Sequence, residues 1–309
     1  MRIKYFFLTL LNGVAGCAHV GREVDNRPGV YSKAEESNHF QDTLSKILKD
    51  SILTHSDAHC AIPSNYYGNF QGLRGEELKS HLHSVVRNHR VLNYQKVWEA
   101  LEETDSCDST VGNVQLIYSM RSQPKSQRDR GTNFNYVEHG YTLNDSWNRE
   151  HVWPKSHGFP NERDTAYTDL HHIRPADRSI NSARNTRSFG LADEVYMDNG
   201  GTTPTLCKTS RTNYSWEPPD GVKGDIARMM FYMVVRYEGP ACDLELVDFV
   251  VPNNNKLPIL GKLSTLIEWH RLDPVDHREQ MRNTIIFERY QGNRNPFIDH
   301  PAFVYLIWK

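Results

Sequence analysis

The sequence has 309 residues, of which 38% are hydrophobic and 24% are charged. This composition is typical of a soluble globular protein that is long enough to bury a core. Its 36 Lys and Arg against 38 Asp and Glu give a net charge of −2, which excludes a protein that coats nucleic acid by bulk charge, so a polyanion would need a local basic patch.

Residues 1–17 have the pattern of a signal peptide, because Arg2 and Lys4 precede about a dozen mostly apolar residues. This apolar run is too short to span a bilayer. It ends in Val14-Ala15-Gly16-Cys17, which resembles the bacterial lipoprotein box, where cleavage precedes a lipid-bearing cysteine. We therefore predict export, with a lipid on Cys17 as the only membrane attachment. The alternative is an ordinary signal peptide that is cleaved after a small residue.

Residues 18–37 are polar and lack periodicity, so we predict a flexible tether. Removal of residues 1–17 leaves four cysteines, and an even number in an exported chain favours two disulfides. Of the three possible pairings we expect Cys60–Cys107 and Cys207–Cys242. The alternative is four reduced, buried cysteines. The spacing does not match a Cys/His zinc finger.

Apolar residues at helical spacing predict most of the secondary structure. The predicted elements, in chain order, are helices at 39–53, 76–91 and 94–101, a strand at 114–118, a long loop at 121–147, and helices at 224–237, 262–270 and 276–289. The sequence shows no internal repeat, and no further linker is evident after the tether. We predict one mixed α+β domain, rich in helix, over residues 38–309.

The stretch 147–190 carries the residues best suited to chemistry. Glu150 and His151 lie near the end of a predicted strand, where Pro154 stops regular pairing. A second predicted strand, 169–175, also ends at a proline, and Asp177 can cap the helix that follows. Glu150 and His151 are adjacent, so both side chains can reach one site only at a strand end.

Basic residues are concentrated in the same part of the chain. The predicted helix carries Asn181, Arg184 and Arg187 at a spacing of three, roughly on one face. Residues 121–190 contain eleven Lys and Arg against eight Asp and Glu, a net charge of +3, and five histidines. This is the local basic patch that binding of a polyanion would require.

These residues resemble the endonuclease I family of exported bacterial nucleases. The resemblance rests on Asn148-Arg149-Glu150-His151-Val152-Trp153-Pro154, Asp169-Leu170-His171-His172 and Asn181-Ser182-Ala183-Arg184, and it extends over Tyr66-Tyr67, Trp216-Glu217-Pro218-Pro219 and Gln291-Gly292-Asn293-Arg294-Asn295-Pro296-Phe297. It implies a ββα-metal (His-Me finger) active site related to that of the HNH nucleases.

The resemblance also implies roles for individual residues. Glu150 matches the family's carboxylate metal ligand, Asn181 its amide ligand and His151 its general base. Oxygen ligands of this kind imply one Mg²⁺, which other divalent cations can replace. The family's phosphate-binding arginine between the two strands has only Arg163 as a candidate here, in a loop of different length, so this role is not assigned.

The remaining polar residues of the stretch have supporting roles in this prediction. Arg184 and Arg187 are predicted to hold phosphate oxygens. Arg149 and His171 are predicted to orient the residues that bind the metal and the substrate. Trp147, Trp153 and the group of Met229, Met230 and Met233 are predicted to belong to the core.

The sequence therefore predicts an exported, Mg²⁺-dependent endonuclease that acts as a monomer. It would hydrolyse DNA, with RNA as a second substrate, show little sequence preference and leave 5′-phosphate ends. It would reside in the periplasm, on the outer membrane or cell surface, or in the medium. Two alternatives stay open: a catalytically inactive nuclease fold that binds DNA as a surface lipoprotein, and a zinc-binding module built on His171, His172 and cysteines.

Overall fold

The computed structural model describes residues 61–309 except 139–140, 240–241 and 253–254, and the side chains of residues 136–143 are also outside the description. The predicted signal peptide, tether, first helix and Cys60 lie outside the described residues. Within the described part, no helix combines the length and the apolar composition needed to cross a membrane.

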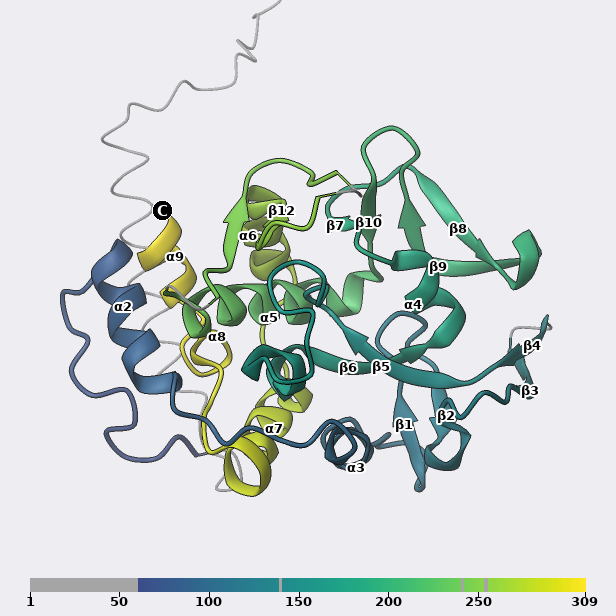
Figure 1. Ribbon diagram of the computed structural model, residues 1–309, viewed down its shortest axis with the longest axis horizontal. Helices are drawn as coiled ribbons and strands as arrows, with labels where there is room; N and C mark the ends of the chain where they lie inside the picture. The colour runs from purple at the N-terminus through teal and green to yellow at the C-terminus, as the bar shows by residue number, and fades with distance from the viewer. Residues whose placement is uncertain (1–60, 139–140, 240–241, 253–254) are drawn as a thin grey trace, which may run out of the picture. The chain divides into compact units, whose positions relative to one another are not determined.

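The described chain is a mixed α+β structure in which helices alternate with short strands (Figure 1). The α-helices are α2 (Gly75–Val86), α3 (Lys96–Thr104), α4 (Arg178–Arg184), α5 (Lys223–Arg236), α6 (Leu263–Leu272), α7 (His277–Ile285), α8 (Pro296–Asp299) and α9 (Phe303–Trp308). The strands are β1 (Asn113–Gln115), β2 (Ser122–Pro124), β3 (Phe134–Glu138), β4 (Tyr141–Asp145), β5 (Trp147–His151), β6 (Ile173–Asp177), β7 (Ser188–Phe189), β8 (Glu194–Asp198), β9 (Thr203–Thr209), β10 (Ser215–Glu217), β11 (Glu245–Val247) and β12 (Ile259–Gly261).

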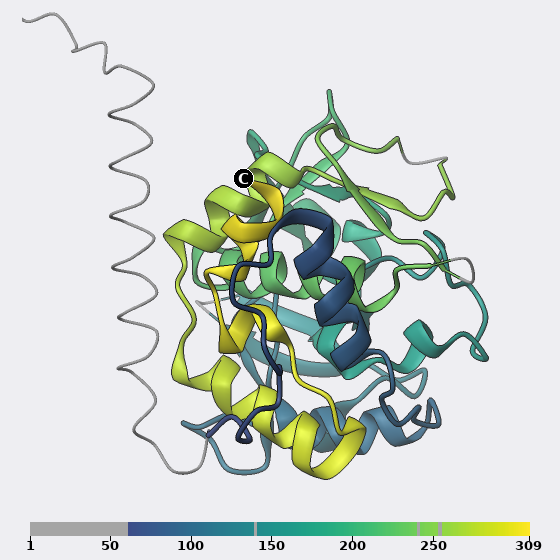
Figure 2. The same cartoon turned by 90° about the vertical axis from the view of Figure 1, so that its left-hand side faces the viewer.

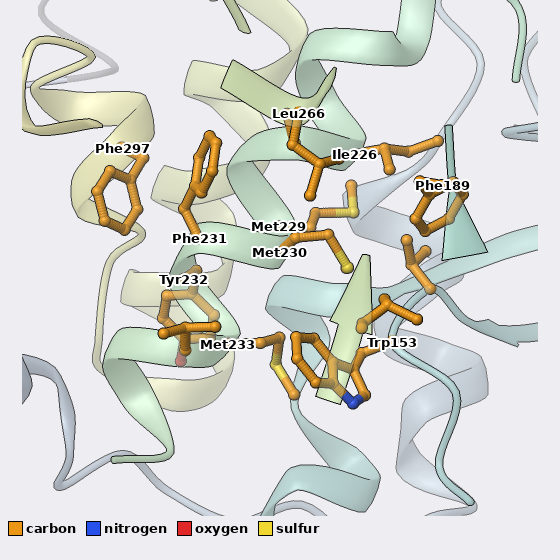
Figure 3. Packing of buried hydrophobic residues seen from close by; sticks show 14 of the residues in the cluster. Trp153, Phe189, Ile226, Met229, Met230, Phe231, Tyr232, Met233, Leu266 and Phe297 are labelled. Atoms are coloured by element: carbon orange, nitrogen blue, oxygen red, sulfur yellow. The ribbon is translucent and has the colours of Figure 1, made fainter. Parts of the chain in front are cut away.

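Helix α5 lies at the centre of the main core. Nearly all of its residues are buried, because α2, α6 and α8 pack around it (Figure 1). Met229, Met230 and Met233 lie among aromatic and aliphatic side chains in this core (Figure 3), so their prediction as core residues is confirmed. Figure 2 shows α2 beside the C-terminal helix α9, and the contacts between these helices agree with this view.

A second apolar cluster lies beneath the strand pair β5–β6. Trp98 of α3 packs edge to face on Trp147 of β5, with ring centroids 5.0 Å apart, and Trp147 is fully buried. Trp153, just beyond β5, is fully buried in the main core. Both tryptophans are therefore core residues, as predicted, and they anchor the strand that carries Glu150 and His151.

Strands β5 and β6 form an antiparallel pair that leads directly into α4. Glu150 lies opposite Arg174, and His151 lies opposite Ile173. The next residue after β6 begins α4, so a strand, a second strand and a helix follow one another around one small region (Figure 1). A four-stranded sheet in the order β7-β10-β9-β8 continues from the end of α4.

The predicted loop at 121–147 is wrong, because it contains β2 and the β3–β4 hairpin, which is paired over five residues. The polar composition conceals this hairpin, since a two-stranded ribbon does not need the alternating apolar face that identifies a strand in sequence. The predicted strand at 114–118 is also shorter than expected, because regular pairing ends at Gln115.

The second strand of the site begins later than predicted. Residues Leu170–His172 form a 3₁₀ turn (η3), since the Asp169 carboxylate accepts a hydrogen bond from the His171 amide at 3.0 Å. Pro175 lies within β6 rather than at its end. The Pro175 carbonyl accepts from the Ile117 amide at 2.9 Å, and a proline fits here because this two-stranded pair leaves β6 an edge on which no amide donor is needed.

Asp169 connects the core helix to this turn. Its carboxylate is fully buried and accepts hydrogen bonds from the hydroxyl groups of Tyr232 and Tyr237, each at 2.8 Å, and from the Gln291 amide at 3.0 Å. Tyr232 belongs to α5 and Tyr237 follows it. The position of η3 and of the strand that follows is therefore fixed from the centre of the main core.

Candidate active site

Glu150, His151 and Asn181 line one cleft. Its volume is about 540 Å³. The lining residues are Tyr94, Trp98, Asp129, Asn148, Arg149, Glu150, His151, Pro154, Lys155, Ser156, Asn181, Ser182, Asn185 and Thr186. Strand β5 contributes the carboxylate and the imidazole, and α4 contributes the amide. The three residues singled out as metal ligands and base are thus brought together, and Arg149 lies with them.

Glu150 is held through one of its two carboxylate oxygens. Its side chain is 3% exposed, and Oε1 accepts hydrogen bonds from the Tyr118 hydroxyl at 2.7 Å and from Arg184 Nη1 at 3.2 Å. Burial raises the pKa of Glu150 from 4.5 to about 7. Oε2 receives no hydrogen bond from the described residues, so this oxygen is left for a ligand in the cleft.

Asn181 is oriented by its neighbour across the site. Its Nδ2 donates to Asn148 Oδ1 at 2.7 Å. This bond uses the amide nitrogen and leaves the carbonyl oxygen of Asn181 as an acceptor toward the cleft. The carboxylate oxygen of Glu150 and the amide oxygen of Asn181 are therefore both available.

This pair of oxygen donors fits a hard cation that keeps most of its water ligands, as Mg²⁺ does. It does not fit a metal held by protein groups alone. The described residues contain no group of three or more His, Cys, Asp or Glu arranged to hold a metal ion. Glu150 and Asn181 are the residues that would bind Mg²⁺ here, with water filling the other positions.

His151 has one ring nitrogen fixed and one left open. Its Nε2 lies 2.9 Å from the Tyr167 carbonyl oxygen. Because a carbonyl only accepts, Nε2 carries the proton, and the neutral ring keeps Nδ1 as a proton acceptor. Burial, with His172 nearby, lowers the pKa of His151 well below 6.5. The imidazole is therefore neutral near pH 7, which a general base requires.

Arg149 forms a wall of the cleft. Its guanidinium carbon lies 3.4 Å from the ring centroid of Tyr94 and 4.3 Å from that of Trp98, and its Nη1 donates to the Tyr94 carbonyl at 2.6 Å. These contacts attach the start of α3 to β5. Arg149 therefore supports the side of the cleft next to Glu150, in keeping with a supporting position.

The prediction that Arg184 binds phosphate is corrected by its surroundings. Its side chain is 1% exposed and does not line the cleft. Besides Glu150, it donates to the carbonyl oxygens of His151 at 3.1 Å and Val152 at 2.5 Å. All of these contacts point into the protein, so Arg184 orients Glu150 and the end of β5 and cannot reach a phosphate.

Arg187 is also directed away from the cleft. Helix α4 ends at Arg184, and Asn185 has a positive φ of 52°, so Arg187 does not continue the face on which Asn181 lies. Its guanidinium donates to the Ala183 carbonyl and lies 4.6 Å from the Tyr214 ring centroid. Among the described residues, the cleft lining includes neither arginine.

The imidazoles of His171 and His172 form hydrogen bonds with backbone carbonyls outside the cleft. The Nε2 of His171 bonds the Asn293 carbonyl at 3.2 Å, and that of His172 bonds the Ala166 carbonyl at 2.8 Å. His171 packs on Tyr232 of the core helix, with ring centroids 4.4 Å apart, and it does not line the cleft. Its influence on the site is indirect, through the position of β6.

The predicted Cys207–Cys242 disulfide is wrong, whereas the predicted Cys60–Cys107 disulfide involves Cys60, which lies outside the described residues. Cys107, Cys207 and Cys242 are free thiols. The sulfur of Cys207 donates to the Tyr118 carbonyl at 3.4 Å, whereas that of Cys242 donates to the Gly158 carbonyl at 3.7 Å. Cys207 is fully buried in the core, and free cysteine is commonly buried as a small apolar residue.

Three residues of the site had no assigned role in the sequence. Tyr118 donates to Glu150, Tyr167 accepts from His151, and Lys155 lines the cleft. Tyr118 ends the predicted strand at 114–118, and Lys155 follows His151 by only four residues. The role of Tyr167 could not be read from sequence, since it acts through its backbone carbonyl.

Comparisons with known proteins all find similarity to nucleases. A family model described as Endonuclease I matches residues 74–302. A protein of Bacillus amyloliquefaciens named extracellular ribonuclease is 42% identical over 302 residues, 97% of this chain and 95% of that protein. One of the same name from Bacillus subtilis (strain 168) is 47% identical over 248 residues, 79% of this chain and 78% of that protein. A protein of Buchnera aphidicola subsp. Baizongia pistaciae named Endonuclease-1 is 29% identical over 131 residues, 42% of this chain and 46% of that protein.

Proposed function

This chain belongs to the endonuclease I family of nucleases, and from that premise we propose that it is an exported, Mg²⁺-dependent endonuclease whose main substrate is RNA. The observation that carries the proposal is the single cleft that gathers Glu150, His151 and Asn181. Strands β5 and β6 with α4 act as its ββα-metal motif.

The residues of the cleft divide the hydrolysis into separate tasks. Glu150 and Asn181 would hold Mg²⁺ through their free oxygens, and when bound the ion would supply Lewis-acid stabilisation of negative charge on the scissile phosphate and the leaving oxygen. His151 Nδ1 accepts the proton of the attacking water. Tyr118 and Arg184 hold Oε1 of Glu150, which leaves Oε2 without a hydrogen bond from the described residues. The products are a 5′-phosphate and a 3′-hydroxyl end.

The choice of RNA as the main substrate reverses the order expected from the sequence, where DNA came first. Two relatives with 42% and 47% identity carry the name extracellular ribonuclease, which supports RNA. DNA stays as a second substrate, because the proposed chemistry uses only the phosphate and a water molecule. Little sequence preference is expected, since contacts to the phosphate carry no sequence information.

The proposed organisation is one nuclease domain over residues 38–309, preceded by a signal peptide and a tether, and acting as a monomer. The word extracellular in the names of the relatives supports export. We predict a lipid on Cys17. Replacing Cys17 with Ser should lower the mass of the mature protein and release it from the membrane fraction. Unchanged mass and fractionation would disprove the lipid attachment.

The test is cleavage by the purified protein. Single-stranded RNA, the same sequence as DNA and a plasmid are incubated with Mg²⁺ or with EDTA, and His151→Ala is the matched control. We expect RNA to be cleaved fastest, only with Mg²⁺ and not by the variant. Absence of cleavage in every substrate with Mg²⁺ would overturn the proposal and favour an inactive nucleic-acid-binding protein, whereas faster cleavage of DNA would overturn only the substrate order.

A further inference from the structure

Besides the proposed Mg²⁺, the cleft needs a cationic side chain that contacts the substrate. Negative charge increases on the phosphate oxygens during hydrolysis, and enzymes stabilise it with positioned cationic groups. The arginines that the sequence offered for this task do not supply it. Arg184 is buried against Glu150, and Arg187 packs on Tyr214. Arg163 is exposed, but it is absent from the described lining of the cleft.

Two permanent cations remain among the described residues that line the cleft, Arg149 and Lys155. Arg149 is held in place by two aromatic rings and by its bond to the Tyr94 carbonyl. Lys155 is different, because its side chain is exposed and one hydrogen bond, to Tyr167, is made by its ammonium. It is the cation whose hydrogen-bonding capacity is largely unused.

Contacts with Tyr167 nevertheless restrict the position of the Lys155 ammonium. Its Nζ donates to the Tyr167 hydroxyl at 2.7 Å and lies 4.7 Å from the centroid of the same ring. An ammonium group has three N–H donors, so this bond leaves two of them for a phosphate. The backbone turns tightly just after His151, where the His157 amide donates to the Pro154 carbonyl at 2.8 Å, and this turn brings Lys155 back to the cleft.

Tyr167 holds both the base and this cation. Its carbonyl accepts from His151 Nε2 at 2.9 Å, and its hydroxyl accepts from Lys155. The residue is 4% exposed, and its ring packs edge to face on His151, with centroids 4.9 Å apart. One buried residue therefore fixes where the proton acceptor and the ammonium lie relative to each other.

We propose that Lys155 is the phosphate-binding cation of this active site, and that Tyr167 is the positioning residue that holds it beside His151. The proposal rests on the proposed nuclease function and adds a substrate contact to it. The ammonium contacts a non-bridging oxygen of the scissile phosphate, on which charge grows as water attacks. Its contribution is therefore larger in the transition state than in the bound substrate.

The test compares four variants of the full protein on one single-stranded RNA oligonucleotide. Lys155→Ala removes the charge, Lys155→Arg keeps it, Tyr167→Phe removes only the hydroxyl, and Lys256→Ala is a control at an exposed lysine outside the cleft. Single-turnover rates are measured at saturating enzyme with Mg²⁺. Binding of the same RNA is measured in EDTA, and thermal unfolding reports whether each variant folds.

We expect Lys155→Ala to lower the single-turnover rate by about 10- to 100-fold, somewhat less than loss of a buried oxyanion donor, because the ammonium is exposed. RNA binding should weaken by less than about 5-fold, since one phosphate contact among several is lost. Lys155→Arg should recover most of the rate. Tyr167→Phe should lower it by about 3- to 10-fold, because the backbone bond to His151 is kept.

Three results would overturn the proposal while the nuclease function stands. They are a wild-type rate for Lys155→Ala, an equal loss in Lys155→Arg, and an equal loss in the control Lys256→Ala. Failure of the proposed function looks different, because the wild-type protein would then not cleave RNA with Mg²⁺ at all.

Discussion

At the scale of single residues, the chemistry of the site depends on which atom of each side chain already has a hydrogen-bond partner in the protein. Tyr118 and Arg184 occupy Oε1 of Glu150, Asn148 occupies the amide nitrogen of Asn181, and Tyr167 occupies Nε2 of His151. In each case the atom that chemistry requires stays unbonded within the described structure. The residue types were evident in the sequence, but these partners, three of which lie far along the chain, were not.

The two proposed metal ligands should differ in strength. Glu150→Gln removes a negative charge, so Mg²⁺ affinity measured by calorimetry should fall by at least about 10-fold, with activity partly restored at high Mg²⁺. Asn181→Ala removes a neutral oxygen and should weaken binding less. Unchanged Mg²⁺ affinity in Glu150→Gln would mean that this carboxylate does not bind the metal.

At the scale of elements, amphipathic helices could be predicted and the polar hairpin could not. The predicted helices near 76–91, 224–237 and 262–270 correspond to α2, α5 and α6, because each buries an apolar face. The predicted helix at 276–289 is α7 followed by a π-helical turn at Ile286–Gln291. The predicted common face of Asn181, Arg184 and Arg187 fails because α4 ends at Arg184.

The hydrogen bonds that cap the N-terminus of α4 also could not be predicted from the sequence. Asp177 occupies the N-cap position, as predicted, but its side chain makes no capping bond and instead pairs with Arg121. The Asp145 carboxylate accepts from the Ser179 amide at 3.1 Å and supplies part of what a cap would provide. The sequence around α4 could not show that Asp145 takes over this role from Asp177, since Asp145 belongs to the preceding hairpin.

Arg184 should matter more for stability than for substrate binding. Arg184→Ala leaves Glu150 buried without its cation and two carbonyl oxygens without a donor, which should cost about 3–5 kcal/mol in the free energy of unfolding. Arg187→Ala, which loses one carbonyl bond and a ring contact, should cost about 1 kcal/mol. Urea denaturation checks both values, and equal costs would contradict the proposed connection between α4 and β5.

At the scale of the whole molecule, buried histidines link stability to pH. Burial lowers the pKa of His171 and His172 from 6.5 to about 4, and that of His270 to about 3. At these three positions the unfolded chain binds protons that the folded chain does not, so the stability that they contribute above pH 6.5 is lost as the pH falls toward 4. This behaviour could not be predicted from the sequence, which does not show which histidines are buried.

His270 offers the clearest test of this effect. Its Nε2 bonds the Pro301 carbonyl at 3.0 Å and its Nδ1 faces Arg228 at 3.4 Å, so protonation would place a second positive charge beside the guanidinium. The loss of unfolding free energy between pH 7 and pH 5 should be about 2 kcal/mol smaller in His270→Gln than in the wild type. The same pH dependence in His270→Gln and wild type would contradict this assignment.

The central claim is that His151 acts as the base while Glu150 and Asn181 hold the metal, and one experiment separates these tasks. Mg²⁺ titration by calorimetry and single-turnover cleavage of RNA are measured together for His151→Ala and the wild type. The account predicts that the variant keeps its Mg²⁺ affinity while its cleavage rate falls by about 10²–10⁴-fold, the usual contribution of a positioned base. Cleavage near the wild-type rate, with Mg²⁺ affinity unchanged, would contradict it.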